Sequence, residues 1–207
     1  VAADPLFTLA YTGVNGGLVV VTADDPGLFS SQNEQDNRYY ASHAKIAMVE
    51  PSDSQECHDF VKEAFEISEK FDTPVLFRVT TRICHSKTIV ETSERKETPV
   101  KPYTKDVSKY VMAPAAAKKR KYIMEDRIEA LKEFSENTRL NRIEAGLNKV
   151  GIITSGISYN HAKEVFGDEV SYLKLGFTWP LPEKLIRKFA GMVDTIYVIE
   201  ENEPYIE

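Results

Sequence analysis

The stretch KIAMVEPSDSQECHDFVKEAFEISEKFDTPVLFRVTTR, residues 45–82, contains a complete strand–helix–strand pattern. The apolar run at its start ends at Pro51, and Ser52 and Gln55 have the spacing of a capping box that begins a helix. Apolar or small side chains then recur at three- and four-residue steps and so share one helix face: Cys57, Phe60, Val61, Ala64, Phe65, Ser68 and Phe71. The β-branched run TPVLFRVTTR predicts the second strand. This order predicts two parallel neighbouring strands, and therefore an α/β fold.

The chain on either side of this unit continues the same pattern. Asp4 and Pro5 predict the start of a helix, Leu18 to Val21 predict a buried strand, and RYYASHA predicts a short helix. Residues 148–207 alternate strand, helix, strand, helix and strand, which predicts half of a doubly wound sheet. The predicted fold class is therefore α/β, with parallel sheets that carry helices on both faces.

The middle of the chain has a different character. SERKETPVKPYTKD is polar and holds two prolines, which indicates an extended connection. AAAKKRKYIMEDRIEALKEFSEN has high helix propensity, and its Ile128, Leu131 and Phe134 share a rough apolar face. Gly146 ends this region. We therefore expect three parts: residues 1–115, a helical connection at 116–147, and residues 148–207.

The composition is that of an ordinary soluble globular protein. Of 207 residues, 42% are hydrophobic and 28% are charged. No apolar run approaches the roughly 20 residues that cross a bilayer, so we expect no membrane partner and a cytoplasmic location. The two cysteines, Cys57 and Cys84, are too few for an iron–sulfur cluster and indicate reduced thiols. No CxxC or HxxxH spacing is present, so we predict no metal site.

The formal net charge of −6 argues against a nucleic-acid partner. One basic run, KKRK at residues 118–121, is the exception. Glu125, Asp126 and Glu129 follow it within two helical turns, so a salt-bridged, solvated helix is favoured over a nucleic-acid patch.

A dense polar loop, TADDPGLFSSQNEQDNRYY at residues 22–40, follows the first strand. Open α/β sheets bind ligands outside the carboxyl ends of their strands. Side-chain amides and hydroxyls donate and accept hydrogen bonds, which suits a neutral heteroaromatic ring or a carboxylate. The alternative is a surface loop whose Asp and Ser side chains only cap turns. Asp24 and Asp25, at the start of the loop, are weaker candidates for such a site.

Two other strand ends carry weaker signals. TTRICH, residues 80–85, offers Arg82, since an Arg can clamp a carboxylate through paired hydrogen bonds, and His85, which alone carries no prediction. TSGIS, residues 154–158, lies where a strand meets a helix, but with a single glycine it is better explained as an ordinary capped turn.

Six segments resemble a known family: DPLFTLAYTGVNGGLVVVTADDPGLFSSQNEQDNRYYA, EPSDSQE, TPVLFRVTTRICHS, VGIITSGISYNHAKEVF, LKLGFTWPLPEKLIRKF and VIEENEPYIE. They are similar to the large (alpha) subunits of the indolepyruvate:ferredoxin oxidoreductases, which are thiamine diphosphate-dependent 2-oxoacid:ferredoxin oxidoreductases. The similarity covers nearly the whole chain. It is most specific at ADDPG followed by SSQNEQDNRYY.

The resemblance implies an enzyme that oxidatively decarboxylates arylpyruvates with coenzyme A to aryl-acetyl-CoA and reduces ferredoxin. It implies thiamine diphosphate with magnesium and iron–sulfur clusters in the complete subunit, a small (beta) partner subunit, and a dimer of the complete subunit. The alternatives left open are a related pyruvate:ferredoxin-type oxidoreductase and a non-catalytic α/β interaction or scaffold module.

The resemblance also implies how the chain divides. We expect residues 1–115 to be the later part of a pyrimidine-binding domain and residues 148–207 to be the first half of a transketolase C-terminal-like domain. The carboxylate that activates the pyrimidine ring is expected upstream of Val1, so no catalytic residue is assigned. The diphosphate site and cluster cysteines are expected downstream of Glu207, so the chain alone is expected to bind no cofactor and to be inactive.

The polar loop would then face the cofactor and substrate cleft. The resemblance makes Ser30, Ser31, Gln32, Asn33 and Arg38 the candidates that line this cleft. Arg38 is the best candidate for binding the substrate carboxylate, and Asp24, Asp25 and Arg82 are weaker candidates.

Overall fold

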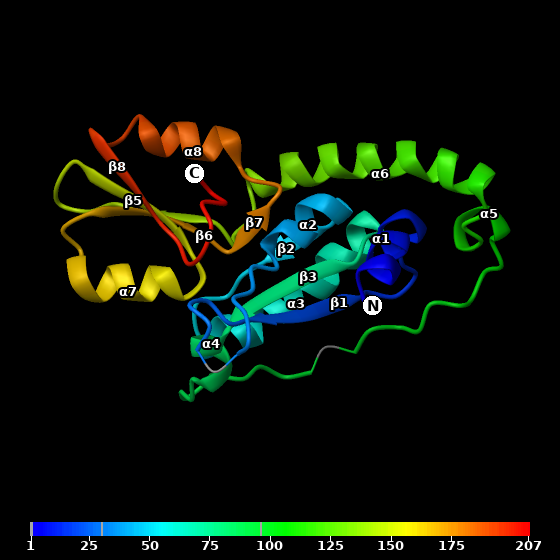
Figure 1. The fold of residues 1–207 in the computed structure, drawn as a ribbon, viewed down its shortest axis with the longest axis horizontal. Coiled ribbons are helices and arrows are strands. Elements are labelled where there is room, and N and C mark those ends of the chain that lie inside the picture. Colours follow the sequence, from blue (N-terminus) through cyan, green and yellow to red (C-terminus); the bar gives the residue numbers. More distant parts are fainter. Residues whose placement is uncertain (1, 30, 96) are drawn as a thin grey trace.

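The computed structural model describes residues 2–29, 31–95 and 97–207, and it contains two four-stranded sheets that lie beside each other (Figure 1). The first sheet has the order β1 (Val19–Asp24), β3 (Val75–Thr80), β2 (Ala47–Val49) and β7 (Phe177–Trp179). The second has the order β4 (Arg142–Glu144), β6 (Ser171–Leu175), β5 (Val150–Ser155) and β8 (Thr195–Ile199). The predicted α/β class with mostly parallel sheets is confirmed.

The helices pack around and between these sheets. They are α1 (Ala3–Thr12), α2 (Arg38–Ala44), α3 (Ser54–Phe71), α4 (Thr81–His85), α5 (Val107–Tyr110), α6 (Pro114–Ser135), α7 (Gly156–Phe166) and α8 (Glu183–Ala190). None of the helices in the described part of the chain is long and apolar enough to cross a membrane.

The first sheet is built on the predicted strand–helix–strand unit. β3 pairs in parallel with both β1 and β2, and Phe77 is the register partner of Val21 on one side and of Val49 on the other. All six residues of β3 are buried, as expected of a strand with neighbours on both edges and helices on its faces.

Helix α3 begins one residue later than the capping-box prediction, which was wrong. The N-cap is Asp53, whose carboxylate accepts a hydrogen bond from the Glu56 N–H at 2.8 Å. Ser52 instead donates through its N–H and its hydroxyl to the Glu56 carboxylate, each at 2.8 Å. The Gln55 side chain bonds to Asp59 and to the backbone of Glu91. Asp competes better than Ser for this position because a carboxylate gains from the positive end of the helix dipole.

The buried stripe of α3 also differs in part from the prediction. Phe60, Ala64 and Ser68 are buried as expected, and Ile67 joins them. Phe65 is 47% exposed, although one edge of its ring lies close to Gly17, where an added Cβ would come within 2.9 Å of it.

The second sheet confirms the predicted βαβαβ order. β6 and β8 both pair in parallel with β5, which lies between them. Adjacent residues of β5 point to opposite faces: Ile152 packs in a cluster with Tyr159 of α7, and Ile153 packs with Phe189 of α8. Figure 1 shows α7 and α8 on opposite sides of this sheet.

Two short antiparallel strands were not predicted. β4 joins the edge of the second sheet at β6, and β7 joins the edge of the first sheet at β2. Only Gly176 separates β6 from β7. A Cβ atom at this position would lie 2.6 Å from the Leu140 carbonyl oxygen and 2.7 Å from the Phe60 ring, so the crossing between the sheets requires glycine. β4 lies before residue 148 but joins the second sheet, and β7 lies after residue 148 but joins the first. The expected three-part division stays a prediction.

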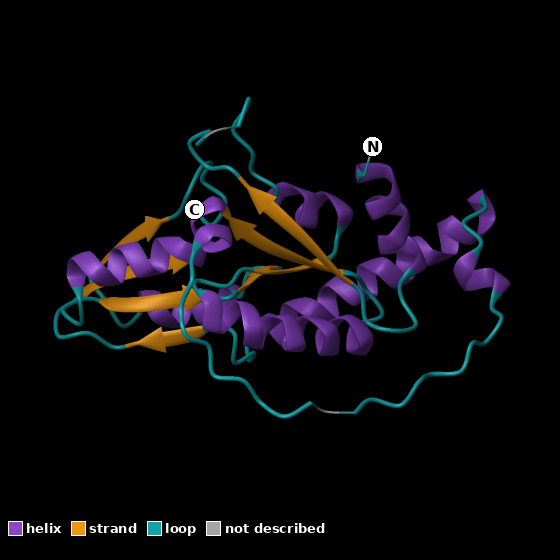
Figure 2. Ribbon diagram, turned by 90° about the horizontal axis from the view of Figure 1, so that it is seen from below, coloured by secondary structure: helices purple, strands orange, loops and turns teal. Residues whose placement is uncertain are grey.

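The connection between α4 and α5 runs along the outside of the molecule without helix or strand in its described residues (Figure 2). It contacts α3 through polar groups, such as Lys101 with Glu69. α6 then passes back over the sheet, with Ile128 and Leu131 buried as predicted and Phe134 half-buried. Lys121 pairs with Glu125 as predicted, but Arg120 of the same basic run is buried and donates to the carbonyls of Tyr11 and Thr12, so the run is solvated only in part.

Candidate functional site

A cavity of about 520 Å³ lies at the carboxyl ends of β1 and β3. It is lined by Asp25, Phe29, Ser31, Thr81, Arg82 and His85. A second cavity of about 540 Å³ adjoins it, because Phe29 and Arg82 line both. The second cavity extends to His161 of α7 and to residues 201–203, which follow β8. The second cavity therefore lies where the loop after β1 meets α7 and the chain that follows β8.

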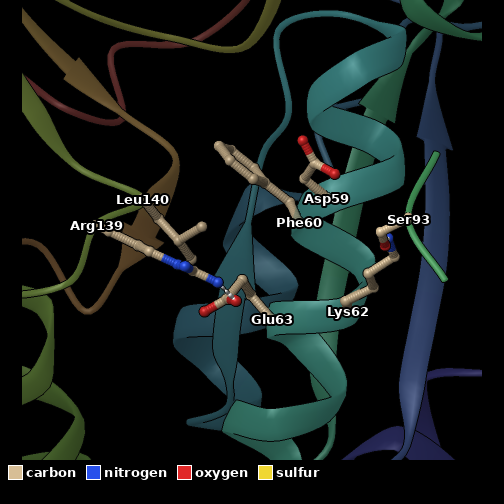
Figure 3. Close-up of a pocket in the computed structure, with 7 residues that line it drawn as sticks. All are labelled: Asp59, Phe60, Lys62, Glu63, Ser93, Arg139 and Leu140. Atoms are coloured by element: carbon tan, nitrogen blue, oxygen red, sulfur yellow. Dashed lines mark hydrogen bonds and ion pairs between the residues drawn. The ribbon is translucent and has the colours of Figure 1, made fainter. Parts of the chain in front are cut away.

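A third cavity, of about 410 Å³, lies on the outer side of α3 (Figure 3). Its charged side chains are already engaged: Arg139 forms an ion pair with Glu63, and Lys62 donates to the Ser93 hydroxyl at 2.9 Å. It lies away from the carboxyl ends of the parallel strands, so the cavities at Phe29 and Arg82 are the better candidate site.

The loop over these strand ends is hydrogen-bonded back to β1, the strand that it follows. The Asn37 N–H donates to the Asp24 carboxylate at 2.8 Å, and the Asn37 side chain donates to the Thr22 hydroxyl at 2.5 Å. The Thr81 hydroxyl lies 2.5 Å from the Asp25 carboxylate, which fixes the start of the loop to the end of β3. The position of the loop is thus set by contacts at both of its ends.

Three consecutive residues of the loop have left-handed backbone angles. The φ angles are 65° at Gly27, 70° at Leu28 and 44° at Phe29. Only glycine adopts this region without cost, so Leu28 and Phe29 store strain. The turn is held by a hydrogen bond of 2.6 Å from the Gly27 N–H to the Glu34 carboxylate. It presents Phe29 with 48% of its surface exposed.

Arg82 extends from α4 to the Phe29 ring, and its guanidinium carbon lies 5.4 Å from the ring centroid. The Arg82 side chain is exposed and forms no ion pair with any residue that the structure describes. It is therefore available to an anionic ligand in either cavity.

A buried ion triad lies beneath the loop. Arg78 of β3 donates to Asp24 at 2.9 Å and to Glu50 at 2.7 Å, and the three side chains are at most 4% exposed. Asp24 Oδ1, Glu50 Oε2 and Arg78 Nη2 have no hydrogen-bond partner among the described residues. Burial raises the pKa of Asp24 despite the opposing charge of Arg78. The triad thus carries incompletely satisfied charge at the strand ends.

Arg38 does not face either cavity. It is fully buried, and it donates to Asp36, to Glu200 and to the backbone carbonyls of Glu201 and Glu203 at distances of 2.5 to 2.8 Å. Burial acts to raise the pKa of Asp36, but the hydrogen bond and charge of Arg38 outweigh it and lower that pKa. In this structure the guanidinium holds the loop to the chain after β8. With these partners, Arg38 is not free to bind a substrate carboxylate.

The remaining sequence candidates lie in different places. Asp25, Ser31 and Arg82 line the first cavity, whereas Gln32 and Asn33 are exposed and line neither cavity. Asp24 is buried in the triad, and Ser30 lies outside the described residues. The sequence reasoning missed Phe29 and Thr81. The signal for Phe29 was available: two large apolar residues directly follow Pro-Gly within a polar loop.

Residues 21–145 match the family described as pyruvate flavodoxin/ferredoxin oxidoreductase, thiamine diP-bdg. The chain belongs to this family. The matched region includes the end of β1, the polar loop after residue 24, β3 and α4, so every residue that lines the first cavity lies within it.

The whole chain also aligns with longer proteins. It is 41% identical over 213 residues to the indolepyruvate oxidoreductase subunit IorA of Methanothermobacter marburgensis, and 44% identical over 219 residues to that of Pyrococcus abyssi. The chain spans about a third of the length of these curated relatives, 34% in each case. A solved 2-oxoglutarate:ferredoxin oxidoreductase from Magnetococcus marinus has a TM-score of 0.62 over 94% of this chain and 42% of that chain. At 15% identity this likeness shows the fold alone.

The family description names thiamine diphosphate, whose diphosphate end is held with a divalent cation. Such a cation needs oxygen ligands gathered around one point. Across residues 2–29, 31–95 and 97–207, no group of three or more His, Cys, Asp or Glu side chains could hold a metal ion. The described part of the chain therefore offers no set of three such ligands for that cation.

Proposed function

We propose that the complete protein is a subunit of a 2-oxoacid:ferredoxin oxidoreductase that acts on arylpyruvates. The observation that carries the proposal is the identity of 41% to 44% with IorA subunits along the entire chain. The reaction consumes an arylpyruvate, coenzyme A and two oxidised ferredoxins. It yields aryl-acetyl-CoA, carbon dioxide, two reduced ferredoxins and one proton.

Several features of this chain support a ligand site of that enzyme at the Phe29–Arg82 cavities. They lie at the carboxyl ends of parallel strands, where α/β folds bind ligands, and all the residues that line the first cavity are within the region that matches the family. A hydrogen bond at Asn37 and an ion pair at Arg38 hold the loop over these cavities in a fixed position. Asp25, Ser31 and Thr81 supply hydrogen-bonding groups on one side.

Other parts of the complete enzyme supply the remaining chemistry in this proposal. Thiamine diphosphate with magnesium would supply the chemistry that decarboxylation of a 2-oxoacid needs, and iron–sulfur clusters would carry the electrons. A small (beta) subunit and ferredoxin are the protein partners, and the location is cytoplasmic. In this proposal residues 1–115 are the later part of the pyrimidine-binding domain, 116–147 are a helical connection, and 148–207 are the first half of the transketolase C-terminal-like domain.

The test uses the native parent protein, purified without oxygen together with the subunits that copurify. Its thiamine diphosphate and iron content are measured, and reduction of ferredoxin is followed with an arylpyruvate and coenzyme A. The expected result is that both cofactors are present and that reduction requires both substrates. A native protein with neither cofactor and no turnover would favour a non-catalytic α/β interaction module instead. Turnover with pyruvate but not with arylpyruvates would favour the pyruvate:ferredoxin type.

A further inference from the structure

Neither Phe29 nor Arg82 belongs to the hydrophobic core, so packing of the core does not explain the contact between them. Phe29 is 48% exposed on a turn that is strained at two non-glycine residues. Such strain persists only where the surrounding structure holds it, and it concentrates at ligand sites. The turn places an aromatic ring at the boundary of two cavities.

The position of Arg82 leaves both partners able to bind a ligand. With its guanidinium over the ring at 5.4 Å, Arg82 is oriented by a cation–π contact and not by an acid. A guanidinium binds a carboxylate through two parallel hydrogen bonds, and an aromatic ring packs against another ring in an offset or edge-to-face arrangement. A carboxylate and an aryl group would thus be recognised at neighbouring points.

The charges around the cavities select the kind of anion. Asp25 lines the first cavity, and three further carboxylates, those of Glu34, Glu201 and Glu203, line the second. These carboxylates repel the multiple negative charges of a polyphosphate, whereas the single charge of one carboxylate is neutralised by one arginine. The site therefore suits an aromatic monocarboxylate better than the nucleotide end of coenzyme A.

We propose that Phe29 and Arg82 form the subsite that recognises the substrate, with Arg82 binding the carboxylate of an aryl-2-oxoacid and Phe29 packing against its ring. In an arylpyruvate only a methylene and a carbonyl separate the ring from the carboxylate, so both groups reach the adjoining side chains at once. This assignment rests on the proposed function, and it gives Phe29 the role of selecting aromatic over aliphatic substrates.

The test compares variants in the complete enzyme. Phe29→Leu keeps an apolar side chain but removes the aromatic face, and Phe65→Leu is the matched control, since Phe65 is 47% exposed on α3 and lines neither cavity. Arg82→Gln removes the charge, and Arg187→Gln, on the exposed side of α8, is its control. Thermal denaturation of each variant separates a loss of fold from a loss of recognition.

For Phe29→Leu, the expected result is an increase of about fivefold in the KM for phenylpyruvate, with little change in kcat. The KM for 2-oxobutyrate should stay unchanged, because that substrate has no ring. For Arg82→Gln, the KM should rise about tenfold or more for both substrates. The KM for coenzyme A should not change in either variant, and both control variants should behave as the wild type.

Equal effects of Phe29→Leu on the aromatic and the aliphatic substrate, or none on either, would overturn the assignment. An increase confined to the KM for coenzyme A would overturn it in favour of a nucleotide site. Binding of phenylpyruvate, measured by calorimetry without coenzyme A or ferredoxin, separates this proposal from the reaction itself. If the wild type turns over no 2-oxoacid, the proposed function fails, while binding that is weakened by Phe29→Leu still supports the subsite. If no binding is found, the subsite fails as well.

Discussion

The Arg38 guanidinium donates to the Glu200 carboxylate at 2.7 Å across 162 positions of the sequence. This buried ion pair joins the start of α2, directly after the site loop, to the chain that follows β8 of the second sheet. The Asn202 side chain adds a hydrogen bond of 2.9 Å to the Gln35 carbonyl in the same loop. The wall of the candidate site is therefore held from both sheets, so its geometry depends on how the sheets dock.

Replacement of Arg38 by Met should destabilise the protein by about 3–5 kcal/mol, because it leaves the Asp36 and Glu200 carboxylates buried without their partner. Urea unfolding measures this change. Arg187→Met, at a side chain that is 82% exposed, should change the stability by less than about 0.5 kcal/mol. Equal effects of the two substitutions would show that the Arg38 network contributes little.

Substitution of Gly176 by Ala should lower the melting temperature, because the added methyl group meets the Leu140 carbonyl and the Phe60 ring at under 3 Å. The expected cost is about 1–3 kcal/mol, as for other overpacked sites. Gly16→Ala is the matched control, since no atom lies within 4 Å of its new Cβ. A melting temperature unchanged in Gly176→Ala would mean that β6 and β7 separate easily at the crossing.

Asp72 should contribute to the loss of stability in acid. Burial acts to raise its pKa, but hydrogen bonds from Lys109 and the Val14 N–H, with the charge of Arg127, outweigh burial and lower the pKa. A carboxylate of this kind stabilises the fold above its ordinary pKa of 3.8, and the contribution is lost as the pH falls through the folded value.

Asp72→Asn should therefore be less stable than the wild type at pH 6 and should lose less stability as the pH falls below about 4. Unfolding by urea at a series of pH values tests this. Asp126→Asn, on the exposed side of α6, makes the same change in charge and should leave the slope unaltered. Parallel pH profiles for Asp72→Asn and the wild type would contradict the assignment.

The two cysteines should react at different rates with iodoacetamide at pH 8. Burial raises the pKa of the half-buried Cys57 thiol to about 11, so little thiolate is present, whereas Cys84 is exposed. Mass spectrometry should show faster labelling at Cys84, and Cys84→Ser should remove the fast phase. Faster labelling of Cys57 would mean that α3 and α4 separate readily.

The strands and helices that have a local apolar pattern could be predicted from the sequence. The β-branched run at β3, the period-3.6 apolar repeat at α3 and the βαβαβ alternation after residue 148 are local patterns that specify these elements. β4 and β7 were not predictable, because each has three residues and exists only as an antiparallel partner at the edge of another strand. A strand of that length carries no periodic signal of its own.

The sequence by itself determined the α/β class, the position of the polar loop at a strand end, and the family resemblance. Only the tertiary structure decided which polar side chains are available to a ligand. The sequence made Arg38 the better candidate and Arg82 the weaker one, yet Arg38 is buried among Asp36 and Glu200 while Arg82 stays open beside Phe29. The reason is physical: an arginine is free to bind a ligand only if folding places no acidic side chain beside it, and Glu200 comes from the far end of the chain.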